Sequence, residues 1–241
     1  MSADNFIYEG KAKKIYQSEK PDEVFIAFKD ELTAFNALKK GSFENKGRIN
    51  RDIASLIFKM LQAKGISSHF VKDQEPCGFV AKKVDIIPLE VVVRNILAGS
   101  TAKKLGIDEG KVLKKPLVEF YYKKDELADP FVSDDQIVMM EIADQKTLDQ
   151  LKVKALAVNE NLKEFFAHCG IDLVDFKIEF GLSKDKEILL ADEITPDCCR
   201  LWDHQTGEKM DKDRFRRDLG NIKSSYEEVL KRLEGLWAQK F

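Results

Sequence analysis

The chain has 241 residues, of which 44% are apolar and 34% are charged. Its 16 phenylalanines, 5 tyrosines and 2 tryptophans supply core material that intrinsically disordered chains lack, which excludes that class. The 40 basic and 42 acidic side chains leave a formal net charge of -2, which excludes a general nucleic-acid binder with a broad basic excess.

The N-terminal third has the pattern of short strands around one helix. Strand-like runs occur at residues 6–8, 13–16, 24–29 and 79–84. Apolar residues recur at helical spacing from Ile49 to Leu61, and Gly65 is typical of a helix end. We expect a small antiparallel β-rich lobe over residues 1–86, with a crossing point to the rest of the chain at residues 86–88.

The larger remainder, residues 87–241, mixes strands with longer helices. An apolar strand at 89–97 precedes a short helix at 99–105 and a strand at 116–122. Apolar side chains in steps of three and four predict a helix at 145–169, which Gly170 ends. Residues 171–180 and 187–194 indicate an antiparallel hairpin, and a final helix spans 222–237. Early strands and late helices indicate an α+β fold rather than regular βαβ alternation.

The sequence shows no sign of a membrane or secretory protein. No apolar run approaches the roughly 18 residues that a membrane helix needs, and the N-terminus lacks a signal-peptide pattern. We therefore expect a cytoplasmic protein with no membrane partner. The four cysteines form no C-x-x-C pair and the three histidines lack ligand spacing, so we expect reduced thiols and no zinc site.

The segment Gly10-Lys11-Ala12-Lys13 lies in a predicted turn between two strands. Small residues in a tight turn let backbone N–H groups approach an anion, and the two lysines add positive charge. The spacing is not that of a Walker P-loop. The turn is similar to phosphate loops that cover a nucleotide in a small β-lobe, and the alternative is a solvated basic hairpin tip.

A second candidate site combines both strands of the predicted hairpin. Asp175, Lys177 and Glu179 share one face of the first strand, because residues two apart in a strand point the same way. Asp192 lies near the end of the partner strand, so Glu179 and Asp192 can come close enough to share Mg²⁺. The alternative is a solvated charged face.

Arginines supply a third candidate site. Arg94 ends an apolar strand and precedes Gly99-Ser100 at a helix start, an arrangement suited to a phosphate group. Arg200 lies in the loop that leaves the carboxylate strand, and Arg216 follows in a basic cluster. For that cluster, an exposed helix face with local ion pairs is the alternative.

Together, these segments resemble the SAICAR synthetase family of purine biosynthesis. The resemblance runs in order from residue 8 to about residue 220, so it covers nearly the whole chain. It rests on seven motifs, which are YEGKAK at 8–13, EVVVRN at 90–95, AGS at 98–100, LVDFKIEFG at 173–181, ADEITPD at 191–197, RLWD at 200–203 and MDKDRFR at 210–216.

The resemblance implies an ATP-dependent ligase. Such an enzyme joins 5-amino-1-(5-phospho-ribosyl)imidazole-4-carboxylate (CAIR) to the amino group of L-aspartate and yields SAICAR, ADP and phosphate. The resemblance also implies ATP in a cleft between the two lobes, a requirement for Mg²⁺, and a homo-oligomer, expected to be a dimer. Because a carboxylate is a poor electrophile, we expect an acyl phosphate intermediate.

The resemblance further implies roles for individual residues. ATP is expected to contact Gly10, Lys11, Ala12 and Lys13, with Lys82 and Ile86 on the adenine side and Glu179 and Asp192 as metal ligands. The ribotide phosphate and carboxylate are expected to contact Arg94, Ser100, Arg200 and Arg216, and Lys177 is expected to contact substrate or phosphate. The implied catalytic residues are Lys177, Lys11 and Lys13.

Two other functions stay open on the residues alone. A small-molecule kinase also suits a β-lobe, a lysine pair and a carboxylate metal site, although the protein-kinase motifs are absent. A non-enzymatic nucleotide- or nucleic-acid-binding module suits the arginines. A ligase requires aspartate and releases inorganic phosphate, which distinguishes it from both alternatives.

Overall fold

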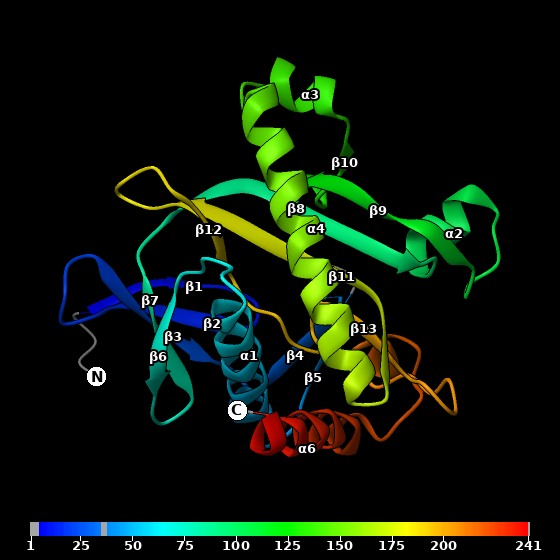
Figure 1. The fold of residues 1–241 in the computed structure, drawn as a ribbon. Helices are drawn as coiled ribbons and strands as arrows, with labels where there is room; N and C mark the ends of the chain where they lie inside the picture. Colours follow the sequence, from blue (N-terminus) through cyan, green and yellow to red (C-terminus); the bar gives the residue numbers. More distant parts are fainter. Residues whose placement is uncertain (1–4, 35–37, 241) are drawn as a thin grey trace.

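The computed structural model describes residues 5–34 and 38–240. Its first layer is an antiparallel sheet in the order β1-β2-β3-β7-β6 (Figure 1). The bounds are β1 Phe6–Glu9, β2 Lys13–Gln17, β3 Glu23–Phe28, β6 Phe70–Gln74 and β7 Gly78–Lys82. Helix α1 (Lys46–Ala63) packs against β3, β6 and β7, with Ile53, Ile57 and Leu61 fully buried. Strands β4 (Glu31–Ala34) and β5 (Lys39–Ser42) form a separate two-stranded ribbon.

A larger second sheet has the order β10-β9-β8-β11-β12, and β13 pairs with β11. The bounds are β8 Asp85–Ile96, β9 Val112–Tyr122, β10 Phe131–Val132, β11 Ile171–Leu182, β12 Ile188–Ala191 and β13 Cys199–Asp203. Helix α4 (Gln145–His168) crosses one face of this sheet (Figure 1). Asp144 begins α4 by accepting a hydrogen bond from the Thr147 amide at 2.8 Å, and Gly170 follows its end with φ 66°.

The remaining helices connect and cover the two sheets. They are α2 Gly99–Leu105, the 3₁₀ turn η2 Asp125–Leu127, α3 Asp134–Met139, α5 Asp213–Arg216 and α6 Ile222–Lys240. Helix α6 packs on α1 at the bottom of Figure 1. The chain passes from the first sheet to the second between Lys82 and Asp85, and one hydrophobic cluster extends through both sheets. The division into domains at residue 86 therefore stays a prediction.

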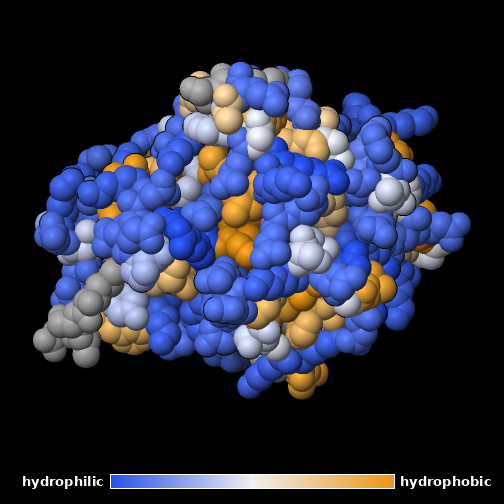
Figure 2. Space-filling model, turned by 90° about the horizontal axis from the view of Figure 1, so that it is seen from below, coloured by the Kyte–Doolittle hydropathy of each residue, from blue (hydrophilic) through white to orange (hydrophobic). Residues whose placement is uncertain are grey.

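The surface seen in Figure 2 is mostly hydrophilic, with a smaller apolar area near its centre. None of the helices that the structure describes combines the length and apolar character that a membrane crossing requires.

The predicted α+β fold with antiparallel sheets is confirmed, and several details differ. Strand β8 begins at Asp85 rather than at Leu89, and helix α3 was not predicted. Strand β9 begins at Val112 rather than at Pro116, because β10 pairs only with the far end of β9 and leaves the proline on an unpaired edge. Strand β12 ends at Ala191 rather than at residue 194, because Asp192 turns to φ 63°. Strands β4, β5, β6, β10 and β13 were not predicted, because such short runs show little apolar alternation.

Candidate active site

The first cavity, of about 490 Å³, lies between the two sheets. We call it the nucleotide cavity. One part of its wall is apolar and consists of Ile15, Val24, Ile26, Val84 and Ile86. The predicted phosphate loop at residues 10–13 and the Lys82 side chain line the same cavity. An apolar wall beside a polar loop suits a ligand with a flat base at one end and charge at the other.

The loop at residues 10–13 is closed by a hydrogen bond from the Gly10 amide to the Lys13 carbonyl at 2.8 Å. Lys11 pairs with the exposed Asp125 at 2.7 Å. Lys13 points the other way, where its ammonium contacts Asp192 and lies 3.3 Å from Glu193. The loop therefore carries one exposed and one half-buried lysine in the wall of the nucleotide cavity.

Glu179 and Asp192 come together as predicted. Strand pairing sets Glu179 opposite Ala191, so the next residue, Asp192, lies beside Glu179 as it leaves the strand. Lys177 bridges them, with its Nζ 2.8 Å from Glu179 and 3.3 Å from Asp192. A third cation, Lys123, directly follows the last residue of β9, and its ammonium contacts Glu179.

Electrostatics keep Asp192 and Lys177 ionised. Burial opposes the charge of Asp192, but Lys13 and Lys177 outweigh it and hold the pKa of that carboxyl well below its usual range. Burial likewise opposes the charge of Lys177, but Glu179 and Asp192 raise its pKa well above the ordinary value. Two further carboxylates contact its lysines, since Glu193 lies 3.3 Å from Lys13 and Glu90 lies 3.3 Å from Lys177. Among the described residues, no group of three or more His, Cys, Asp or Glu side chains is arranged to hold a metal.

His69 forms a hydrogen bond with the backbone of Asp192, a role that no sequence pattern indicated. Its Nε2 lies 3.1 Å from the Asp192 carbonyl oxygen, and its ring packs edge-on against Phe58 and Phe79. Burial, assisted by the nearby Lys13 charge, lowers the pKa of His69 to about 4. The ring is therefore neutral near pH 7 and donates its Nε2 hydrogen to the Asp192 carbonyl.

The second cavity, of about 400 Å³, contains the predicted arginines. We call it the anion cavity. Its wall includes Arg94, Ser100, Lys177, Arg200 and Arg216, all of which the sequence singled out. The arginines at 214 and 217 do not line it, and Arg217 instead pairs with Glu109 at 2.7 Å on the surface.

Buried carboxylates fix the three arginines in place. Asp175 lies 2.6 Å from Arg94 and 2.8 Å from Arg200. Asp213 lies 2.9 Å from Arg200 and 2.6 Å from Arg216. The guanidinium groups are thus aligned before any ligand arrives, which lowers the cost of binding.

Two further features of the anion cavity escaped sequence analysis. Glu119 of β9 accepts a hydrogen bond from Arg94 Nε at 2.8 Å, although it lies 25 residues along the chain. Gly99 has φ 61°, and a Cβ placed there would lie 2.3 Å from Arg200 Nη2. Glycine therefore avoids a steric clash with the Arg200 guanidinium, and it also adopts this positive φ without strain.

The two cavities share part of their lining, which consists of Lys11, Ala12, Glu90, Lys177 and Glu193. Every site residue predicted from the sequence lines at least one of them. The contents of the two cavities can therefore meet beside Lys177, between the carboxylate pair and the arginines.

Comparison with known proteins agrees with this arrangement. The sequence profile described as SAICAR synthetase matches residues 6–233. The phosphoribosylaminoimidazole-succinocarboxamide synthase of Halalkalibacterium halodurans is 53% identical over 97% of this chain and 99% of its own. The crystal structure of the enzyme of that name from Ehrlichia chaffeensis superposes with a TM-score of 0.93 at 45% identity, over 95% of this chain and 98% of its own. A SAICAR synthetase in complex with ADP superposes with a TM-score of 0.92 at 44% identity, over 95% and 97% of the two chains.

These relatives, which match nearly the whole chain, are ligases, and the chain is an enzyme of that class. The chain belongs to the SAICAR synthetase family.

Proposed function

We propose that this chain joins the carboxylate of CAIR to the amino group of L-aspartate, with conversion of ATP to ADP and phosphate. The single observation that carries the proposal is the meeting of the nucleotide cavity and the anion cavity beside Lys177. A phosphoryl donor in one cavity and a carboxylate in the other can meet only there. Family membership and the relative that binds ADP support the same reaction.

ATP would lie with its base against the apolar wall near Ile86 and its phosphates under residues 10–13. Glu179 and Asp192 would hold Mg²⁺, since this ion binds through one or two carboxylates together with phosphate oxygens and water. When bound, Mg²⁺ neutralises charge on the phosphate oxygens. The two-carboxylate donor set fits that role, because it leaves coordination positions for the nucleotide.

The ribotide would lie in the anion cavity. Arginine forks bind phosphate through paired N–H donors, and Arg94, Arg200 and Arg216 are already aligned by Asp175 and Asp213. Ser100, at the start of α2, adds a hydroxyl to the same wall. This placement directs the carboxylate of the ribotide toward Lys177 and the nucleotide.

We propose a reaction in two steps. The ribotide carboxylate attacks the terminal phosphorus of ATP, the bond to ADP breaks, and an acyl phosphate forms. The amine of L-aspartate then attacks the acyl carbon, loses a proton and displaces inorganic phosphate. Lys11, Lys13 and Lys177 carry positive charge around the transferred group and offset the negative charge that develops on it.

The proposal is tested by measuring ADP release while each substrate is omitted in turn. The expected result is release that requires both the ribotide and L-aspartate, with one phosphate formed for each ADP. Continued turnover with the ribotide alone, and a stable product that carries a second phosphoryl group, would instead indicate a kinase. Positional isotope exchange in ATP without aspartate tests the acyl phosphate, and its absence would favour a concerted route.

The family resemblance also leads us to propose a homodimer in the cytoplasm. Light scattering after gel filtration tests the dimer, which should have twice the mass of the chain, and cell fractionation tests the location.

A further inference from the structure

Lys212 differs from the other cationic side chains of the anion cavity. These side chains are Lys11, Arg94, Lys177, Arg200, Lys212 and Arg216. All of them except Lys212 pair with a carboxylate. Within the described part of the chain, no ion pair or hydrogen bond involves the ammonium of Lys212. An unpaired cation in the wall of a cavity indicates that the partner is a ligand.

Among the carboxylates, Asp197 exerts the largest electrostatic attraction on Lys212, but it already has hydrogen-bond donors of its own. Asp197 accepts hydrogen bonds from Lys46 at 2.5 Å, from Asn50 at 3.0 Å and from Tyr226 at 2.8 Å. Three donors satisfy most of its lone pairs, and Lys46 already neutralises its charge. Asp197 therefore attracts Lys212 without serving as its partner.

None of the other charged neighbours of Lys212 is its ion-pair partner either. Glu193 attracts Lys212 but lies 3.3 Å from Lys13, and Arg216 repels it. Burial lowers the pKa of Lys212, Asp197 opposes that shift, and Arg216 and Lys46 add to it. Its charge is thus incompletely compensated, and an anion bound beside it would restore the balance.

We propose that Lys212 binds a carboxylate of the amino-acid substrate, and this inference rests on the function proposed above. The arginines of the cavity are suited to phosphate through paired donors, whereas a lysine is a single point charge. The Lys212 amide donates to the Pro196 carbonyl at 3.0 Å, which ties Lys212 to the loop that follows Glu193. Glu193 lines both cavities, so Lys212 lies close to the place where the amine must reach the acyl carbon.

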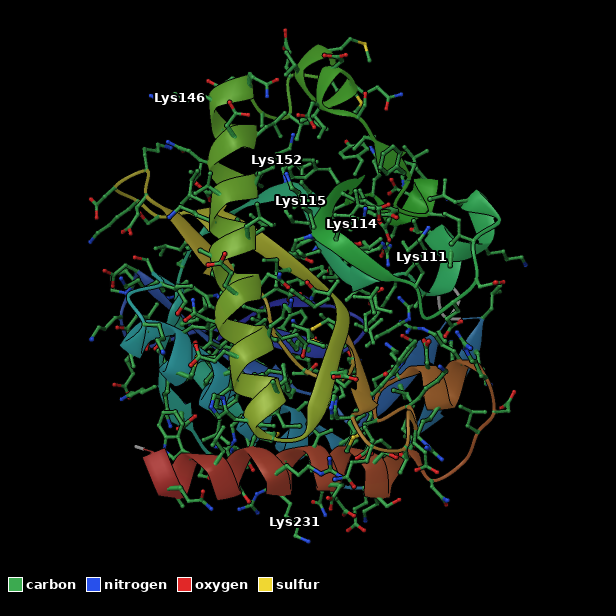
Figure 3. The ribbon with its side chains drawn as sticks, turned by 45° about the vertical axis from the view of Figure 1, so that its right-hand side comes forward. Lys111, Lys114, Lys115, Lys146, Lys152 and Lys231 are labelled. Atoms are coloured by element: carbon green, nitrogen blue, oxygen red, sulfur yellow. The ribbon has the colours of Figure 1, made fainter. Side chains whose placement is uncertain are left out.

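Steady-state kinetics of Lys212→Met test the inference, because methionine removes the charge and keeps most of the stem. The KM for L-aspartate should rise about 10-fold or more, since hydrogen bonds to charged groups are among the stronger ones. The kcat and the KM values for ATP and the ribotide should stay within about twofold. Lys212→Arg should restore part of the loss. Lys231→Met is the control, because Lys231 is exposed on α6 and points away from the molecule (Figure 3).

Two kinetic results would overturn the inference. A rise in the KM for the ribotide in place of that for aspartate would assign Lys212 to the first substrate. A fall in kcat with an unchanged KM for aspartate would assign it to proton transfer.

A binding measurement separates this inference from the proposed reaction. Succinate, a dicarboxylate without an amine, is titrated into wild type, Lys212→Met and Lys212→Arg in a calorimeter. Wild type should bind succinate more tightly than Lys212→Met by about 10-fold or more. Affinity should fall at alkaline pH in wild type but not in Lys212→Arg, whose guanidinium keeps its charge. These results would support the site even if no aspartate-dependent turnover occurred, and equal succinate affinity in wild type and Lys212→Met would refute it.

Discussion

Acidification should destabilise the candidate site through His69. The ring is 3% exposed, packs against Phe58 and Phe79, and holds the Asp192 carbonyl while neutral. Burial first, and the charge of Lys13 second, lower its pKa from 6.5 to about 4. Protonation in the folded state would place a second positive charge near Lys13 in a dry environment.

The sign and size of the effect follow from that pKa. Between pH 6.5 and pH 4, the unfolded chain binds a proton at this histidine and the folded chain does not. The contribution of His69 is therefore fully present above pH 6.5 and is lost as the pH falls toward 4. At 1.36 kcal/mol for each pH unit, the free energy of unfolding should fall by about 3 kcal/mol.

Urea unfolding at several pH values, followed by tryptophan fluorescence, measures this effect. The wild type should lose about 3 kcal/mol more than His69→Gln between pH 7 and pH 4, because all other titrations are shared. His204→Gln is the control, since the pKa of the exposed His204 is raised by its hydrogen bond to Asp172 and its effect has the opposite sign. Parallel curves for wild type and His69→Gln would show that burial of His69 does not link folding to pH, as would a His69 ring that titrates near pH 6.5 by NMR.

Three substitutions test the two cavities. Glu179→Gln should lower kcat about 100-fold or more with the fold intact by circular dichroism, and near-normal turnover would remove this residue from the metal site. Asp213→Asn should raise the KM for the ribotide about 10-fold, because Arg200 and Arg216 lose their common partner; the exposed Asp218→Asn serves as the control. Gly99→Ala should displace Arg200 and lower the free energy of unfolding by about 1–3 kcal/mol, and unchanged ribotide affinity in this variant would contradict the close contact.

The carboxylate pair was predictable because it depends on local periodicity. Glu179 follows Lys177 by two residues, and a hairpin brings Asp192 back beside it, so strand geometry alone joins them. The same reasoning placed residues 10–13 in a turn. Arg94 could be predicted because a cation at the end of an apolar strand is unusual, and Arg200 because it lies in the segment that leaves the strand before Asp192.

The supporting residues could not be predicted, because they act over long separations in the chain. Glu119 reaches Arg94 only because β8 and β9 pair in one register, and Asp213 reaches Arg200 only because α5 packs beside β13. The buried pair of Lys46 and Asp197 joins residues that are 151 apart. No periodic pattern marks such contacts, since each side chain taken alone resembles an ordinary surface charge.

An amide bond between the aspartate nitrogen and the ribotide carboxylate is the bond that the proposed reaction must form. The most direct test supplies L-aspartate labelled with ¹⁵N at the amine, together with ATP, Mg²⁺ and the ribotide, and determines the product by mass spectrometry. The product should be a succinocarboxamide that carries one labelled nitrogen, with one ADP and one inorganic phosphate formed for each. A product that keeps the phosphoryl group transferred from ATP, or one that carries no label, would contradict the proposed reaction.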